Sequence, residues 1–298
     1  MPDRALAENA PHSRDHIVRG HSAGFVDDYY AVKHLLVCWT TASGGSTLLH
    51  CTKVEKSCNV DSSFRRTSSR LMLPLKDDAP RLTTPYINYF IIAANIIVFI
   101  FEIMPPGLNS TIVQFGLIPG KIPLWLSGSP AVPAGAALLP IFTSMFLHAG
   151  FWHLAGNMWF LRIFGDNVED QLGHFGYLVF YLVAGALAAA THIVFNFYSL
   201  VPTAGASGAI AGVMGAYFIL FPSARVLTWF FVFFLWLPAW VMLGYWFVVQ
   251  FLTGAANAIS STATGGGVAF GAHVGGFIAG VIMIKLLPLR PRRYRYGH

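Results

Sequence analysis

The chain has 298 residues, of which 55% are hydrophobic and 11% are charged, with a mean hydropathy of +0.58 and a formal charge of +6 at pH 7. Soluble domains carry about 25% charged residues, so this composition excludes an ordinary soluble globule and predicts a polytopic membrane protein. Most basic residues lie before residue 82 or at the C-terminus. That distribution is typical of the cytoplasmic flanks of membrane spans, and we expect no nucleic-acid partner.

Residues 1–71 differ in kind from the rest of the chain. They are polar and lack sustained helical or strand periodicity, which is typical of disorder. All three cysteines, Cys38, Cys51 and Cys58, fall here, so the apolar region has no cysteine for a disulfide, a metal site or a nucleophile. Composition changes abruptly at Met72. We expect residues 1–71 to be either a disordered cytoplasmic extension or a gene-model extension that is not part of the functional protein.

The apolar region that follows predicts an all-α fold with six transmembrane helices. Two of the expected spans are shorter than the ~20 residues that cross a bilayer alone, so the longer helices should shelter them. A Pro- and Gly-rich apolar stretch up to His148 is expected to lie in the membrane interface. The six expected spans are Tyr86–Met104, Phe151–Phe164, Phe175–Phe197, Ala206–Phe221, Val226–Leu252 and Gly267–Leu287.

Basic residues predict the orientation of these spans. With the N-terminus inside, the outer segments hold only Lys121. The inner segments hold the other basic residues of the region, which predicts that both termini are cytoplasmic. Residues 288–298 are then a basic cytoplasmic tail. The inner basic residues are Lys76, Arg81, Arg162, Arg225, Arg290, Arg292, Arg293 and Arg295.

Two spans carry a reactive side chain among small residues. Ser207 stands in Gly205-Ala206-Ser207-Gly208, where the small neighbours suit either close helix packing or an accessible nucleophile. His273 shares a helix face with Gly276 and Gly280, which lets a partner backbone approach. The pattern favours a meeting of Ser207 and His273, and the alternative is a histidine that bonds a neighbouring carbonyl.

A third polar group enters the second span. His148 is followed by His153 and Asn157 at helical spacing. A metal site is the weaker interpretation, because asparagine is a poor zinc ligand and no carboxylate or thiolate lies on that face. The better interpretation is a pair of donors, the Asn157 amide and the His153 imidazole, that point at a developing oxyanion.

The order His-x4-His-x3-Asn, then GxSG, then AHxxGxxxG, on separate spans, resembles the rhomboid family of bacterial-type intramembrane serine proteases over roughly residues 72–287. The resemblance implies a rhomboid protease domain over 72–287, with Ser207 as nucleophile and His273 as general base and acid. It implies that His153, Asn157 and the Ser207 backbone N–H form the oxyanion hole, with His148 near the active-site mouth. No cofactor and no metal are expected.

The resemblance further implies an endopeptidase that hydrolyses peptide bonds in or next to transmembrane segments of membrane-protein substrates. Its partners are then those substrates and the lipid bilayer, and its expected location is a bacterial inner membrane. Two rivals belong to other classes. A rhomboid-like pseudoprotease would lack the serine or the histidine, and a transporter would show internal repeats; the sequence shows neither feature.

Several positions carry further expectations. Leu139-Pro140 stands where rhomboids often have Trp-Arg, and Ala211 stands where some members have a tyrosine that stacks on the histidine. The acidic residues Asp166, Glu169 and Asp170 are expected at a solvated helix end. His192 and Asn196 are expected either to join a polar network or to form hydrogen bonds between helices, and we favour the second.

Overall fold

The computed structural model describes residues 36–43, 46–53, 72–105, 107–230, 232–259 and 269–290. The chain divides into two units, Met1–Thr67 and Ser68–His298. In the first unit, strands β1 (Leu36–Ser43) and β2 (Ser46–Lys53) pair antiparallel. The other residues of the predicted extension 1–71, and residues 291–298 of the predicted tail, lie outside the described ranges, so both assignments stay predictions.

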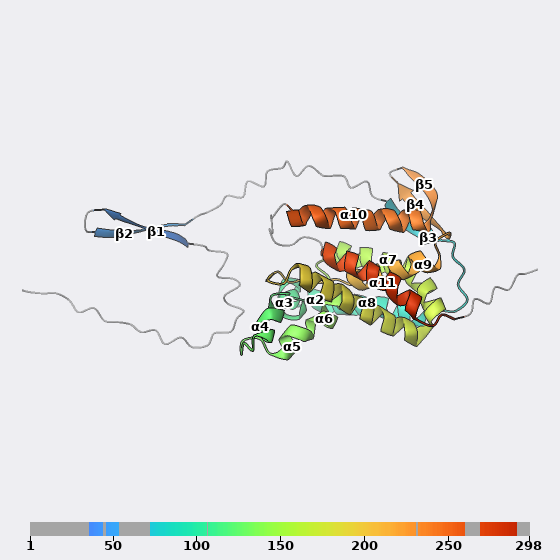
Figure 1. Cartoon of the computed structure of the whole chain (residues 1–298), viewed down its shortest axis with the longest axis horizontal. Helices are drawn as coiled ribbons and strands as arrows, with labels where there is room; N and C mark the ends of the chain where they lie inside the picture. The colour runs from blue at the N-terminus through green and yellow to red at the C-terminus, as the bar shows by residue number, and fades with distance from the viewer. Residues whose placement is uncertain are drawn as a thin grey trace, which may run out of the picture. The chain divides into compact units, whose positions relative to one another are not determined.

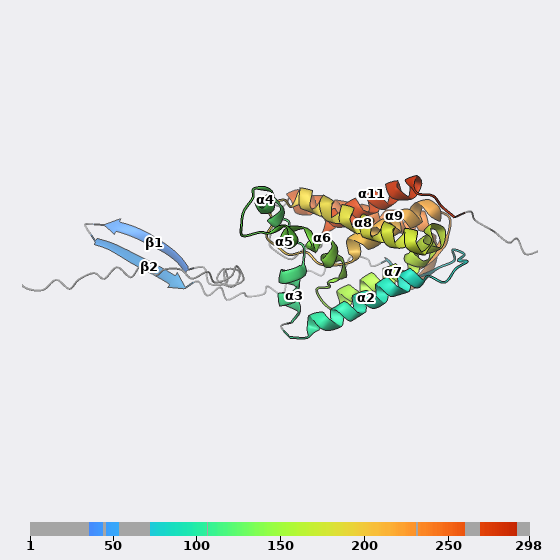
Figure 2. The same ribbon diagram turned by 90° about the horizontal axis from the view of Figure 1, so that it is seen from below.

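The second unit is a bundle of helices, which confirms the predicted helical membrane fold (Figure 1). Five short helices gather at one end of the bundle, as Figure 2 shows: α3 (Leu108–Phe115), α4 (Lys121–Leu126), α5 (Ala134–Leu138), α6 (Pro140–Thr143) and the 3-10 helix η1 (Ser144–Phe146). The long helices are α2 (Tyr86–Ile103), α7 (Phe151–Leu172), α8 (His174–Phe195), α9 (Ser207–Leu220), α10 (Ala239–Ile259) and α11 (Phe270–Leu286).

The helices differ in their capacity to cross a bilayer. Among the described residues, α2 and α8 are long and apolar enough to span alone. A third candidate joins Ala134–Phe146 to α7 through a 75° bend. The apolar helices α9, Ala239–Ala255 and α11 are shorter. The expectation of a short fourth span fits α9, which has 14 residues. The expected short second span is wrong, because α7 runs for 22 residues from Phe151 to Leu172. The exact number of six spans stays a prediction.

The predicted fifth span is wrong in its first half. Residues expected to begin a helix at Val226 instead form strands β4 (Arg225–Phe230) and β5 (Phe233–Pro238), which pair antiparallel. Strand β3 (Met72–Asp77) adds to β4 on its other side. The run is rich in aromatic and β-branched residues, which favour strands, and Pro238 cannot sit inside a helix without breaking it.

Helix α9 forms the centre of the bundle. It packs against α7, α8 and α11, and almost every one of its side chains is buried. Its sequence is rich in glycine and alanine, and small residues let neighbouring helix backbones approach closely in a membrane. The residue that begins this helix, Ser207, is therefore held at the core of the unit.

Two of the three acidic residues after the predicted second span are buried, which corrects the expectation of a solvated helix end, whereas Asp166 is partly exposed and pairs with Arg81 at 2.8 Å. Helix α7 continues past Phe164 to Leu172, and Glu169 and Asp170 are buried. The Glu169 carboxylate accepts the backbone N–H groups of Ile87 and Asn88 at 3.0 and 2.7 Å. These N–H groups belong to the first turn of α2, where a helix has no carbonyl of its own to bind them and favours a negative charge.

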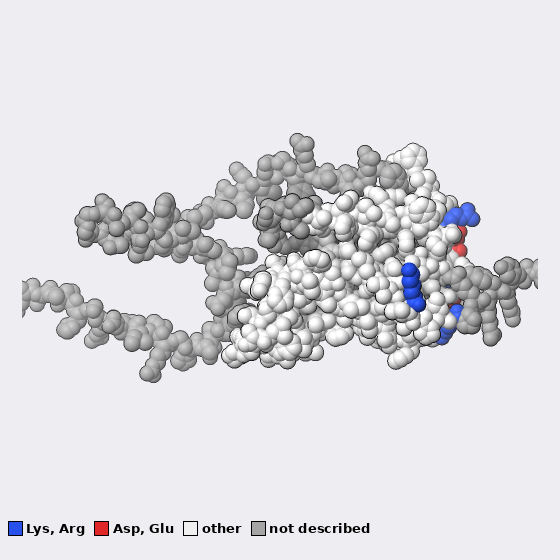
Figure 3. All heavy atoms as spheres, in the orientation of Figure 1, with Lys and Arg blue, Asp and Glu red and all other residues white. Residues whose placement is uncertain are grey.

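More hydrogen bonds complete this polar region, which we call the capping cluster: Thr83, Asn88, Glu169, Asp170 and Tyr177. Asp170 accepts the N–H of Thr83 at 2.8 Å. Asn88 donates to the Leu161 carbonyl at 3.1 Å and accepts the Tyr177 hydroxyl at 2.8 Å. On the face shown in Figure 3, the charged side chains of the described residues lie toward one end of the bundle.

Candidate active site

Glycines bring α9 and α11 into backbone contact. A Cβ added at Gly276 would collide with the Gly208 carbonyl oxygen, and one added at Gly280 would collide with the Gly212 carbonyl oxygen. Both pairs advance by four residues in the same direction, so the helices run parallel with their N-terminal ends together. That register sets Ser207, at the start of α9, beside His273, in the first turn of α11.

Ser207 and His273 meet as the sequence predicts. The His273 Nε2 atom lies 2.7 Å from the Ser207 Oγ atom. The imidazole is buried and the serine is half-buried. At the other end of the ring, Nδ1 lies 3.0 Å from the Oε1 atom of Gln250 on α10. The Trp246 ring, one turn earlier on α10, lies with its centroid 5.8 Å from that of His273.

His153 borders the same space from α7. Gly205 has a φ of +142°, and a Cβ there would meet His153 Cε1 at 2.8 Å and Ser207 Oγ at 3.6 Å. The chain therefore passes between the two side chains only because residue 205 has none. The backbone N–H of Ala149 donates to His153 Nδ1 at 3.4 Å, which leaves Nε2 to carry the ring hydrogen.

Asn157 and His148 complete the predicted set. Asn157 lies one helical turn after His153 and is buried, and its Nδ2 has no hydrogen-bond partner within the described part of the chain. His148 is fully buried, and its ring packs edge-on against His153 with centroids 5.2 Å apart. Its two ring nitrogens also lack a partner there, so this side of the site holds hydrogen-bonding capacity that the fold itself leaves unused.

The loop that leads into Ser207 is fixed from two sides. The Gly205 N–H donates to the Ser144 carbonyl at 2.9 Å, and Thr203 exchanges backbone hydrogen bonds with Leu117 at 2.8 and 2.9 Å. His192 Nε2 lies 2.9 Å from the Thr203 hydroxyl. His192 thus links α8 to this loop, and Asn196 bonds back to His192 within the same segment. These bonds form a local polar network, which corrects the favoured expectation that the two residues bond between helices.

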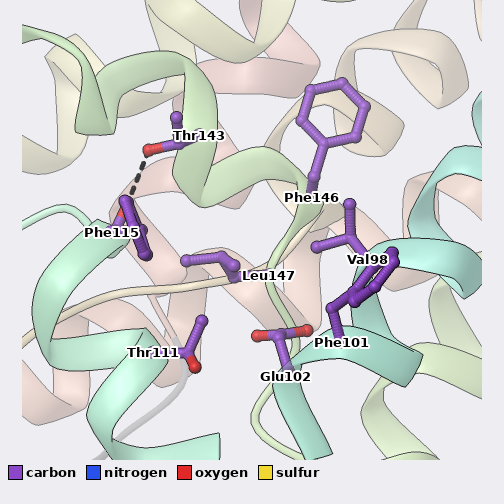
Figure 4. Close-up of a pocket in the computed structure, with 8 residues that line it drawn as sticks. All are labelled: Val98, Phe101, Glu102, Thr111, Phe115, Thr143, Phe146 and Leu147. Atoms are coloured by element: carbon purple, nitrogen blue, oxygen red, sulfur yellow. Dashed lines mark hydrogen bonds between the residues drawn. The ribbon is translucent and has the colours of Figure 1, made fainter. Parts of the chain in front are cut away.

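Glu102 supports the segment that carries His148. This carboxylate at the end of α2 is buried, and both its oxygens lie 3.1 Å from the His148 backbone N–H. It lines a pocket of about 440 Å³ between α2, α3 and η1, which Figure 4 shows. The other lining residues are Val98, Phe101, Thr111, Phe115, Thr143, Phe146 and Leu147.

Sequence comparison decides the family. Residues 136–290 match the Rhomboid domain. The chain belongs to the rhomboid family. It is 35% identical over 149 residues to the mitochondrial Rhomboid protein 1 of Saccharomyces cerevisiae, 31% over 172 residues to the Rhomboid protease GluP of Bacillus subtilis, and 30% over 145 residues to the mitochondrial presenilin-associated rhomboid-like protein of Homo sapiens.

These matches cover part of each protein. They take in 48%, 54% and 46% of this chain, and 40%, 31% and 33% of the three relatives. The rhomboid membership supports a multi-pass integral membrane protein. Because two of these relatives are named mitochondrial and one is bacterial, the predicted bacterial inner membrane is not confirmed and stays a prediction.

The structure of this rhomboid also shows what replaces the family tyrosine at Ala211. A methyl group cannot stack on an imidazole, and the ring of His273 is instead contacted by Trp246 and Gln250 of α10. The sequence interpretation missed Gln250 and Glu102. Each is a polar side chain inside an otherwise apolar stretch of its helix, a signal that the sequence contains.

Metal-binding side chains are not clustered in the described ranges. No group of three or more His, Cys, Asp or Glu residues could hold an ion there. The facing pair His148 and His153 is accompanied by Asn157, whose amide is a poor ligand. The donor set therefore fits hydrogen bonding to an oxyanion better than coordination.

Proposed function

We propose that this rhomboid is a serine endopeptidase that cleaves peptide bonds in or next to transmembrane segments, with Ser207 and His273 as its catalytic residues. The observation that carries the proposal is the 2.7 Å separation of Ser207 Oγ and His273 Nε2 within a membrane helix bundle. A serine hydroxyl is a weak nucleophile until a base within hydrogen-bond reach takes its proton. The name of the Bacillus subtilis relative, a rhomboid protease, supports the same activity.

The first step is attack by Ser207. His273 Nε2 accepts the hydroxyl proton while Oγ bonds to the scissile carbonyl carbon, and the carbonyl electron pair moves to oxygen. The resulting imidazolium then gives its proton to the departing amine, which leaves an acyl-enzyme. Water then releases the acyl group. His273 takes a proton from the water while the water oxygen bonds to the acyl carbon, the bond from that carbon to Ser207 Oγ breaks, and the imidazolium returns its proton to Oγ.

The oxyanion needs donors that are already in position. Asn157 Nδ2 is buried without a partner among the described residues, so it can donate to that oxygen without losing another bond. His153 Nε2 carries a hydrogen on the side that faces Gly205 and Ser207. The Ser207 N–H stands at the start of α9, where the helix dipole favours negative charge. Preorganised donors of this kind supply much of the catalysis in acyl transfer.

The substrate class follows from the location of the site. A peptide bond in a helix has its carbonyl bonded within the helix, so the cleaved segment must be extended or must unwind first. A single-span membrane protein with small or helix-weakening residues near one end of its span meets that need. We propose further that His148, whose ring is buried against His153, lies near the mouth of the site. We also propose that both termini are cytoplasmic.

The test is direct. The purified full chain is reconstituted with a panel of single-span proteins, and products are read by mass spectrometry. Wild type should cleave members of the panel and should react with a fluorophosphonate at Ser207. The variants Ser207→Ala and His273→Ala should lose activity by at least about 10⁴-fold while remaining folded. Cleavage that persists in Ser207→Ala would overturn the dyad, and inhibition by a chelator that zinc reverses would favour a metal site.

A further inference from the structure

Helix α10 supplies a polar group to His273 that no family motif in the sequence predicts. Gln250 Oε1 lies 3.0 Å from His273 Nδ1, on the opposite edge of the ring from Ser207. A neutral imidazole has one N–H and one lone pair, and the bond made by one nitrogen decides what the other can do. An amide oxygen at Nδ1 holds the hydrogen there and keeps the lone pair on Nε2, which faces the serine hydroxyl.

We infer that Gln250 is the positioning residue of this site, fixing the tautomer and the ring orientation that let His273 act as a base. The inference rests on the proposed function. Asp or Glu occupies the equivalent role in a Ser-His-Asp arrangement, whereas here an uncharged amide suits a site inside a helix bundle, because a buried carboxylate is costly there.

Packing around the ring supports this role. The tyrosine position of the family holds Ala211, which cannot cover the imidazole. Trp246 lies one turn before Gln250 on α10, and its ring lies 5.8 Å from His273 with the planes inclined by 38°. The same face of α10 therefore gives His273 both a ring contact and a hydrogen bond. Helix α10 packs against α11 along this line.

No described carboxylate competes for the imidazole. The titratable groups that act on His273 are His153 of α7 and His192 of α8, and α9 contributes the Ser207 hydroxyl. His192 is bonded to Thr203 and Asn196, and His153 is bonded to the Ala149 N–H. The acceptor that lies against His273 Nδ1 is therefore Gln250 Oε1, at 3.0 Å.

The experiment compares three variants of the full chain on a substrate that wild type cleaves. Gln250→Met keeps the length of the side chain and removes the acceptor. Gln250→Glu keeps the acceptor and adds a charge. Thr253→Val is the control, because among the described residues the Thr253 hydroxyl bonds the Val249 carbonyl of its own helix. The folding of each variant is checked by its thermal transition, and the reactivity of its Ser207 by fluorophosphonate labelling.

Gln250→Met should lower kcat about tenfold, or about 1.4 kcal/mol in activation free energy, with KM unchanged. Gln250→Glu should retain more of kcat at its optimum than Gln250→Met, since its carboxylate still accepts from Nδ1. An ionised carboxylate beside an imidazole stabilises the protonated ring. The acidic limb of the kcat/KM profile should therefore move to higher pH by about one unit or more. Thr253→Val should match wild type in both respects.

If Gln250 only filled space, the order of the two kcat values would be reversed. The apolar and isosteric methionine would then be tolerated better than the charged glutamate. The inference is overturned if Gln250→Met retains wild-type kcat, or if the profile of Gln250→Glu superimposes on that of wild type. If Gln250→Met does not fold, the pH profile of Gln250→Glu alone decides. Failure of the proposed function is a different result, in which wild type cleaves nothing or Ser207→Ala still cleaves.

Discussion

Two buried polar regions of this rhomboid differ in how completely their hydrogen bonds are made. In the capping cluster, Glu169, Asp170, Asn88 and Tyr177 all bond one another or the backbone. Around Ser207, the Asn157 amide and both ring nitrogens of His148 have no partner within the described ranges. Buried polar groups cost free energy unless they are paired, so the paired region holds the fold and the unpaired one is available to a reacting substrate.

One asparagine on α2, Asn88, and one on α7, Asn157, make this comparison testable as a matched pair. Asn88 and Asn157 are both buried carboxamides in helices. Removal of each should affect a different property: activity for Asn157 and stability for Asn88. If both substitutions lowered the same property by similar amounts, the distinction between the regions would be wrong.

Among the changes that test this comparison, the largest effect is expected from Asn157→Ala. Loss of one oxyanion donor costs on the order of 10²–10³ in kcat, or about 2.7–4 kcal/mol. KM should change little, because the donor acts on the transition state. Thermal stability should stay equal or rise, since the variant removes a buried donor that has no partner among the described residues. Measurements of kcat, KM and Tm in one detergent check this, and an unchanged kcat would assign Asn157 to structure.

The next effect is expected from Asn88→Ala. This variant leaves the buried Tyr177 hydroxyl without its acceptor and removes one of the donors to the Leu161 carbonyl, which lies inside α7. An unsatisfied buried group costs about 1–3 kcal/mol, so we expect a loss of that size in the free energy of unfolding. The value of kcat per folded molecule should not change. A drop in kcat without a drop in Tm would show that the capping cluster takes part in catalysis.

Local motifs predict that Ser207 and His273 meet, whereas hydrogen-bond partners that lie far apart in the chain could not be predicted from the sequence. Ser207 and His273 were expected to meet because glycine spacing on α9 and α11 sets the approach of the two helices, and the structure shows that contact. The burial of Glu169 depends on N–H groups of α2 that lie more than 80 residues earlier in the chain. No pattern around Glu169 itself indicates that partner, so the local sequence favours a solvated helix end instead.

The hairpin of β4 and β5 was missed for a different reason. Hydropathy alone does not separate a strand from a helix in a continuous apolar run, and the run through Leu252 was long enough for a span. The clustered aromatic and β-branched residues and Pro238 were the local signals against a helix. Gln250 was missed because a lone amide in such a run has no motif, and its role depends on the position of His273.

The smallest effect is expected where the chain is shortened to Met72. Strand β3 begins at Met72, and three hydrogen bonds hold it against the bundle. The Pro74 carbonyl accepts the Trp159 indole N–H at 2.6 Å, and Asp77 accepts the Tyr217 hydroxyl and the Asn167 amide. We propose that residues 1–71 are dispensable, so a chain that begins at Met72 should match the full chain in Tm and kcat.

The control is a chain that begins at Ala79 and therefore lacks β3. It leaves the buried Tyr217 hydroxyl without that acceptor and β4 without its neighbour, and should lose about 2 kcal/mol or more in stability. Equal stability of the two shortened chains would show that β3 is no anchor. Reduced cleavage by the chain from Met72 would assign a role to residues 1–71, and peptides from that segment in the native protein would show that it is made.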